Sequence, residues 1–147
     1  MLLSSVTGFT YDAKQVSAAD AVNGNASFRI IVDLLGDGSV IKDLAFEPYY
    51  NIAAHNPLNA ASILTGVSQT WVATQTDGKF WASGVTTAAG VSGGGGAYAT
   101  NFTLAQLVAA YPLAEVVGIS VGMGTYNVNQ VVEVDNLNFN GGMITGF

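Results

Sequence analysis

The stretch from Leu44 to Ser83 constrains the fold most strongly, because it concentrates large aromatic residues around a tight-turn signal. It contains both tryptophans of the chain, and Trp71–Thr76 is rich in β-branched and aromatic residues. Asp77-Gly78 is typical of a two-residue type I′ turn, and Phe80-Trp81 follows it. We therefore predict a β-hairpin here, in which two tryptophans on adjacent strands anchor a hydrophobic core.

Strand signals recur along the rest of the chain, with turn residues between them. Ser27–Leu35 is almost continuously apolar, as expected for a buried central strand, and Asp37-Gly38 turns the chain into Val40–Phe46 as a second hairpin. One helix is predicted after Thr103, because Thr103-Leu-Ala-Gln106 fits a capping box and apolar residues then recur at helical spacing. Further strands are predicted at residues 5–13, 115–121, 128–140 and 143–147, and loops at residues 52–66 and 84–100.

These elements predict an all-β fold. About seven strands with one short helix and frequent turns are typical of an antiparallel β-sandwich of the jelly-roll type. The length of 147 residues fits one domain, so we assign residues 1–147 to a single sandwich.

The chain is unusually poor in charge. Charged residues are 10% of the sequence, against about 25% in an ordinary soluble domain, and the net charge is -6. The four basic residues are scattered, so nucleic acid is excluded as a partner because its binding needs a basic stripe. No apolar run approaches the roughly 20 residues of a membrane-spanning helix. Half of the residues are hydrophobic, and this apolar excess favours burial between copies of the chain, as a homo-oligomer.

Several motifs resemble those of secreted bacterial jelly-roll domains found in surface or sorted proteins. The resemblance runs from about Ser5 to Gly141 and rests on motifs spread along the chain: Phe46-Glu47-Pro48-Tyr49-Tyr50-Asn51, Thr70-Trp71, Gly78-Lys79-Phe80-Trp81-Ala82-Ser83, Leu104 to Pro112, Gly118 to Gly124, and Val134-Asp135-Asn136-Leu137. Phe80 stands where the family has the first tryptophan of a pair. The resemblance implies a jelly-roll scaffold outside the cell or at its surface, without a defined activity.

Relative to that family, the chain begins almost inside the domain. An absent first strand would leave an unpaired sheet edge, which invites pairing with another chain. We therefore expect a second copy or another polypeptide to complete the sheet at an assembly edge near the N-terminus, formed by Leu2, Leu3, Val6 and Phe9.

An aromatic platform is the alternative functional hypothesis. Aromatic faces with a few polar groups are typical of carbohydrate-binding sandwiches, so a glycan is a candidate partner. The candidate residues, which could equally pack in the core, are Tyr49, Tyr50, Trp71, Trp81 and Asp135.

Other motifs give weaker chemical hypotheses. Asp33 and Asp37 resemble part of a calcium-binding turn, although two carboxylates alone are too few and no other cofactor is implied. Glu133-Val-Asp135 places two carboxylates on one strand face, without a third acidic residue, and His55 is a lone histidine in a loop, so no catalytic set is assembled. Gly93–Gly96 lacks the lysine of a phosphate loop.

The leading prediction from sequence is a non-catalytic, extracellular or cell-surface structural subunit. Low charge, high apolar content and an incomplete sandwich favour self-association, for example into a filament, sheath or surface layer. Two glycosylation patterns, at Asn25 and Asn101, would be meaningful on a secretory route.

Overall fold

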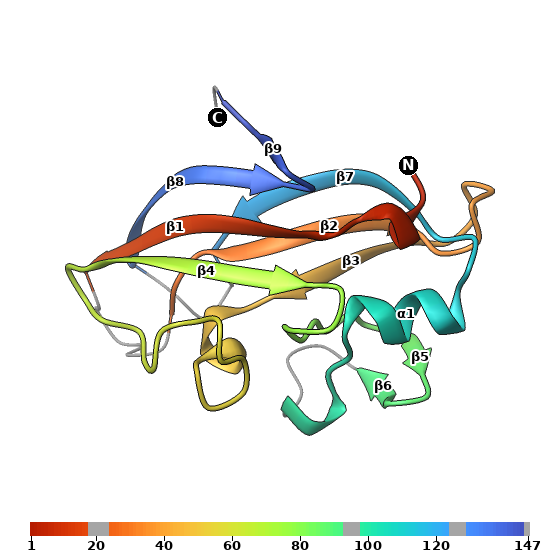
Figure 1. The fold of residues 1–147 in the computed structure, drawn as a ribbon, viewed down its shortest axis with the longest axis horizontal. Coiled ribbons are helices and arrows are strands. Elements are labelled where there is room, and N and C mark those ends of the chain that lie inside the picture. The colour runs from red at the N-terminus through yellow and green to blue at the C-terminus, as the bar shows by residue number, and fades with distance from the viewer. Residues whose placement is uncertain (18–23, 93–97, 124–128, 146–147) are drawn as a thin grey trace.

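The computed structural model describes residues 1–17, 24–92, 98–123 and 129–145 of the chain. The Gly93–Gly96 run lies outside these described residues. Two antiparallel sheets pack face to face, and one short α-helix lies at one end (Figure 1). The predicted all-β sandwich with one short helix is therefore confirmed.

The strands of each sheet come from distant parts of the chain. The first sheet, here called the β1 sheet, has the order β4 (Ser68–Thr74), β1 (Gly8–Ser17), β8 (Val131–Phe139) and β9 (Gly142–Met143). The second, the β2 sheet, has the order β3 (Ile41–Phe46), β2 (Ser27–Asp33) and β7 (Glu115–Gly122). A separate small ribbon pairs β5 (Val85–Thr87) with β6 (Gly90–Ser92), inside the segment predicted as loop.

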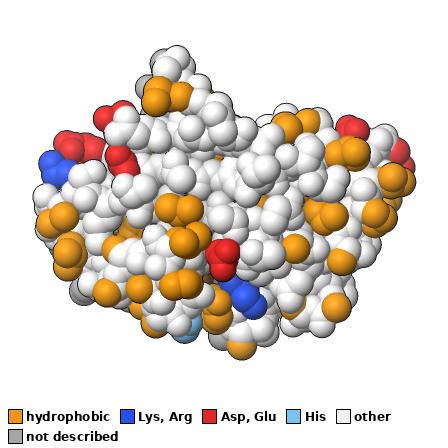
Figure 2. Space-filling view, viewed as in Figure 1, with side chains coloured by type: hydrophobic (Ala, Val, Ile, Leu, Met, Phe, Trp, Pro, Cys, Tyr) orange, Lys and Arg blue, Asp and Glu red, His pale blue; other side chains and the backbone are white. Residues whose placement is uncertain are grey.

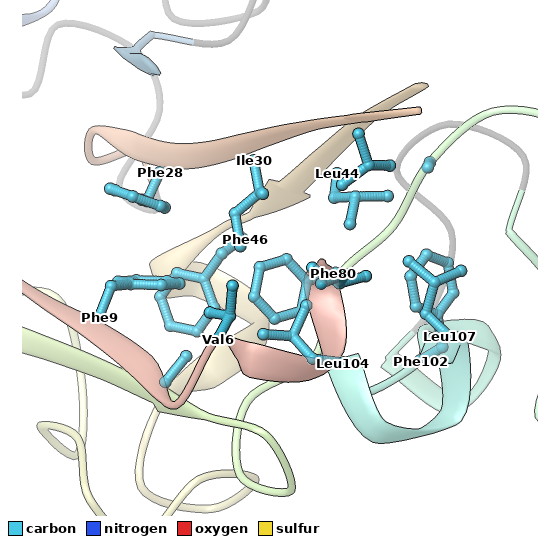
Figure 3. Close-up of a cluster of buried hydrophobic side chains, with 14 of the residues drawn as sticks. Val6, Phe9, Phe28, Ile30, Leu44, Phe46, Phe80, Phe102, Leu104 and Leu107 are labelled. Atoms are coloured by element: carbon cyan, nitrogen blue, oxygen red, sulfur yellow. The ribbon is translucent and has the colours of Figure 1, made fainter. Parts of the chain in front are cut away.

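Aromatic rings join the two sheets at the centre of the core (Figure 3). Phe9 of β1 stacks on Phe28 of β2, with ring centroids 4.0 Å apart and an interplanar angle of 18°. Phe46 meets Phe9 edge-on at 5.1 Å, and Phe80 lies 5.7 Å from Phe46. Such contacts add about 0.5–1.5 kcal/mol each to the free energy gained from area burial. The core is therefore an aromatic contact between sheets, with Trp71 fully buried beside it.

The helix forms where its cap was predicted. α1 (Leu104–Ala110) begins after Thr103, whose side chain accepts a hydrogen bond from the Gln106 N–H, and the Gln106 side chain accepts one from the Thr103 N–H. Leu104 and Leu107 are fully buried on the core side. Among the described residues no helix has the length and apolar character needed to cross a bilayer.

The predicted hairpin between Ser27–Leu35 and Val40–Phe46 is confirmed as the β2–β3 pair. Its turn is organised by two aspartates. The Asp33 carboxylate accepts hydrogen bonds from the backbone N–H groups of Leu35 and Gly38, and the Asp37 carboxylate accepts from the Ser39 N–H and hydroxyl.

The predicted hairpin around Asp77-Gly78 is wrong. A turn does form, closed by the Thr74 N–H donating to the Asp77 carbonyl at 2.8 Å, but the chain then crosses to the other sheet. Trp81 exchanges both backbone hydrogen bonds with Ala45 of β3. The free side of β4 is already occupied, because the Asn59 side chain both accepts from and donates to the backbone of Val72.

We predict that Trp71→Ala destabilises the fold severely, by about 3–5 kcal/mol, because a fully buried indole would leave a large cavity. The Trp71 indole N–H has no hydrogen-bond partner among the described residues, so Trp71→Phe is the matched control and should cost much less. Urea unfolding followed by circular dichroism measures both changes. Equal losses for the two variants would contradict this description of the core.

Candidate functional site

An apolar groove runs along one side of the sandwich, between the edges of the two sheets. β7 and β8 flank it, and its volume is about 490 Å³. Figure 1 shows these two strands at the top of the view. The groove is lined by Ala26, Ile119, Ser120, Val121, Gly122, Met123, Val132, Val134, Leu137 and Ile144. No charged side chain lies among these ten residues, and we refer to this site as the β7–β8 groove.

Strand periodicity explains the apolar lining. Ile119 and Val121 are paired with Ile30 and Phe28 of β2, so their side chains point to the core face of the β2 sheet. They remain only half-buried, whereas Ile30 and Phe28 are fully buried. The inner face of β7 therefore extends past the area that the β1 sheet covers.

A β-bulge turns the end of β8 toward the groove. Asp12 pairs with Asp135 and Thr10 pairs with Asn138, so two residues of β8 lie opposite the one residue between Asp12 and Thr10. Asn136 takes the left-handed conformation, with φ of 51°, and its side chain donates to the Asp12 carboxylate at 2.7 Å. The extra residue resets the strand alternation, and Leu137 points inward and is buried.

Three of the sheet edges carry covering groups. Asn59 contacts the free side of β4 at Val72, Trp81 pairs with Ala45 of β3, and β9 pairs with only the last residues of β8. On β7, the N-terminal segment covers only the first residues: Val116 exchanges hydrogen bonds with Met1. No described residue pairs with the outer edge of β7 from residue 117 to residue 122.

The expected assembly edge is not at the N-terminal strand. β1 pairs with β4 on one side and β8 on the other, so it is a central strand. Leu3, Val6 and Phe9 are buried in the core, and Leu2 bridges to Glu115. The motif resemblance implies an unpaired edge near the N-terminus, but β8 returns from the far end of the chain to pair with β1. Among the described residues, β7 has an unpaired outer edge over residues 117–122.

The predicted aromatic platform is dispersed. Trp71 is buried in the core, and Trp81 is half-buried beside β3. Tyr49 and Tyr50 follow β3, with ring centroids 5.1 Å apart, and Tyr49 is 47% exposed. Asp135 lies on the outer face of β8, in the other sheet. Only the two tyrosines are therefore brought together near a surface.

The carboxylates considered for chemistry are held by local contacts. Asp33 and Asp37 bind the N–H groups of their own turn, as described above. Glu133 forms an ion pair with Lys14 at 3.1 Å, and Asp135 accepts a hydrogen bond from the Asn136 N–H. Within the described ranges, no three His, Cys, Asp or Glu residues lie together as a metal site would require.

His55 and the two glycosylation patterns also have defined surroundings. The exposed His55 ring stacks on Tyr98 at 4.0 Å, and the Tyr98 hydroxyl donates to the His55 carbonyl. Asn25 is 4% exposed and Asn101 is fully buried. Neither asparagine is therefore accessible to a glycan in the folded chain.

One polar cluster lies on the outer face of the β2 sheet. Arg29 donates to the Asp43 carboxylate at 2.8 Å. Burial raises the pKa of the nearby Glu47 carboxyl, while contact with the Trp81 indole and the positive charge of Arg29 act in the opposite direction. The cluster binds β2 to β3 rather than opening into a cavity among the described residues.

Comparison with known proteins gave no significant match: no protein-family model, curated protein or solved structure corresponds to this chain. The resemblance noted from the motifs stays a prediction.

The groove residues were missed from sequence, although β7 carried a usable signal. Glu115-Val-Val-Gly-Ile-Ser-Val-Gly122 has no lysine, no proline and one charge, at its first position. Natural edge strands commonly carry lysine, other charged residues or proline, which prevent pairing with another chain. Their absence fits either a central strand or an edge that is covered by another chain.

We predict that Glu47→Gln gains stability relative to the wild type as pH rises from about 4 to 7. A raised pKa means that the folded state holds its proton longer than the unfolded state, so the wild type loses stability as pH rises through that range. Glutamine does not titrate. Urea unfolding at several pH values measures the difference, with Glu133→Gln, at an exposed carboxylate of β8, as the control. A difference that stays flat or shrinks with pH would contradict the assignment.

Proposed function

We propose that this protein is a non-catalytic structural subunit that self-associates through the open side of its sandwich. The observation that carries the proposal is the coincidence of two unsatisfied features: the uncovered backbone edge of β7 and the apolar β7–β8 groove beside it. Each is costly in water, since exposed strand edges template pairing and apolar grooves favour burial. A partner that lies along this side relieves both.

Exposed side chains of β7, β8 and β9 extend the apolar surface beyond the groove lining. Val117, Val131 and Met143 are 56%, 54% and 68% exposed. A stable interface commonly buries about 800 Å² on each partner, more than a groove floor alone provides. These side chains of β7, β8 and β9 supply further contact area.

The charges on this side of the sandwich do not oppose association. β7 and β8 contain no lysine or arginine, which commonly block edge pairing. On the face seen in Figure 2, hydrophobic side chains are scattered among uncharged atoms and few charged ones. A net charge of -6 over the whole chain gives modest mutual repulsion, and none of it arises from the groove lining.

We place the assembly outside the cell or at its surface, as a filament, sheath or surface layer. The motif resemblance supports that location. Growth beyond a pair of copies needs a second contact surface. Exposed apolar residues lie in the segment between η2 (Pro48–Asn51) and β4, where Leu58, Leu64 and Val67 are each about half exposed.

A carbohydrate-binding role is the second candidate, and the specific observation in its favour is the exposed Tyr49 ring with the half-buried Tyr50 ring beside it. Two rings at 66° to each other offer a smaller stacking surface than the platform predicted from sequence. A glycan array compared for the wild type and Tyr49→Ala tests this role.

We predict that Val134→Lys weakens self-association at least about tenfold. Lysine on the inner face of β8 can reach solvent through the open groove in a single copy, but would be buried uncompensated in the assembly. Sedimentation velocity over a range of protein concentrations measures the effect. Ile41→Lys, a similar change at a half-exposed position of β3, at the edge of the β2 sheet opposite β7, is the control and should associate like the wild type. A wild type that sediments as a single copy at all concentrations would refute the proposed function.

A further inference from the structure

We infer that the partner on the open side is a second copy of this chain, paired edge to edge through β7 about a two-fold axis. This inference rests on the proposed function and specifies its contact. Pairing of β7 with the β7 of the partner would join the two β2 sheets into one continuous sheet with three strands from each copy.

The chemistry of the groove favours a strand over a small apolar ligand. An acyl chain or aromatic compound could fill the apolar floor, but it offers no hydrogen-bonding groups to the backbone of β7. Backbone N–H and C=O groups along residues 118–122 run beside that floor without a described partner on the outer side. Only another peptide backbone satisfies these groups in series while its side chains cover the groove.

Strand geometry limits the symmetric register. The β2–β7 ladder is irregular where Ile31 and Val32 pair with Gly118 and Val116, so Val117 is a bulged residue and regular pairing is expected from Gly118 onward. In an antiparallel pair, directly opposite residues share a face of the sheet. A two-fold axis must therefore pass at a residue rather than between two residues, and the longest ladder over 118–122 is centred on Ser120.

This register matches side chains of similar kind. Ile119 lies opposite Val121 of the partner subunit on the groove face, and Ser120 lies opposite its own copy on the outer face. Gly118 lies opposite Gly122 of the partner subunit. Small residues at the ends and matched β-branched side chains inside make the segment self-complementary, with the apolar pairs contributing to the ladder.

The same register minimises charge repulsion. Glu115 is the one charged residue of β7, and an antiparallel ladder centred on Ser120 separates the two copies of Glu115 by about 30 Å, at about 3.4 Å rise per residue. That distance exceeds the screening length of about 8–10 Å at moderate salt. A parallel pairing would instead place the two glutamates side by side.

Disulfide trapping tests the contact, because the chain has no cysteine of its own. Ser120 is exposed, so Ser120→Cys is expected to fold. Directly opposite Cα atoms are about 4.5–5.5 Å apart in an antiparallel pair, within the range that a disulfide spans. Under mild oxidation we expect Ser120→Cys to form a covalent dimer at protein concentrations where the wild type associates.

Two control variants make the result specific. Ser68→Cys places the thiol on an exposed serine of β4, in the other sheet, and should remain uncrosslinked under the same conditions. Gly118→Cys tests the register, since it should not link to itself but should link to Gly122→Cys when the two proteins are mixed. The backbone tolerates both changes, because neither glycine has positive φ and an added Cβ at either makes at most ordinary van der Waals contact.

The outcomes separate this inference from the proposed function. Rapid, selective linkage of Ser120→Cys supports β7 pairing. A wild type that associates while Ser120→Cys stays unlinked would overturn the β7 contact and leave self-association standing. A wild type that remains a single copy, with no linkage, would overturn both, and a bound lipid found by native mass spectrometry in that case would identify the groove as a ligand site instead.

Discussion

The stacking of Phe9 on Phe28 is the contact on which the sandwich depends, because it joins the central strand of one sheet to the central strand of the other. Phe46 and Phe80 extend the aromatic cluster toward α1, where Leu104 and Leu107 close that end. Burial is nearly complete on this side of the molecule. Burial decreases toward β7 and the far side of β8, where the side chains that point toward the core are only half-buried. The closed core thus fixes the relative position of the sheets, and the open side is what remains uncovered.

Local signals in the sequence predicted local structure well. Thr103 and Gln106 specify the helix start through their own hydrogen bonds, and Asp37-Gly38 joins strands that are neighbours in the chain. These interactions depend on residues a few positions apart, which a sequence displays directly. Pro48 likewise follows the end of β3, as expected for a residue that cannot donate to a ladder.

Contacts between distant segments were harder to predict. Asp77-Gly78 predicts a two-residue hairpin. In the structure, however, the Asn59 side chain already binds the free edge of β4, and Trp81 pairs with Ala45 of β3 instead. The partner of Phe9 in β8, Phe139, lies 130 positions away in the sequence, so its pairing could not be predicted from local signals. The expectation of a missing strand stays a prediction, while the unpaired outer edge of β7 among the described residues follows only from the strand order. The role of Tyr49, Tyr50 and the resemblance to surface proteins stay predictions.

Amide hydrogen exchange along β7, measured at low and high protein concentration, tests most directly whether another copy covers the open side. The contact proposed here predicts that the outward-facing amides among residues 118–122 become strongly protected as concentration rises, while those of β2, already paired on both sides, do not change. Exchange along residues 118–122 that is fast and independent of concentration would contradict it.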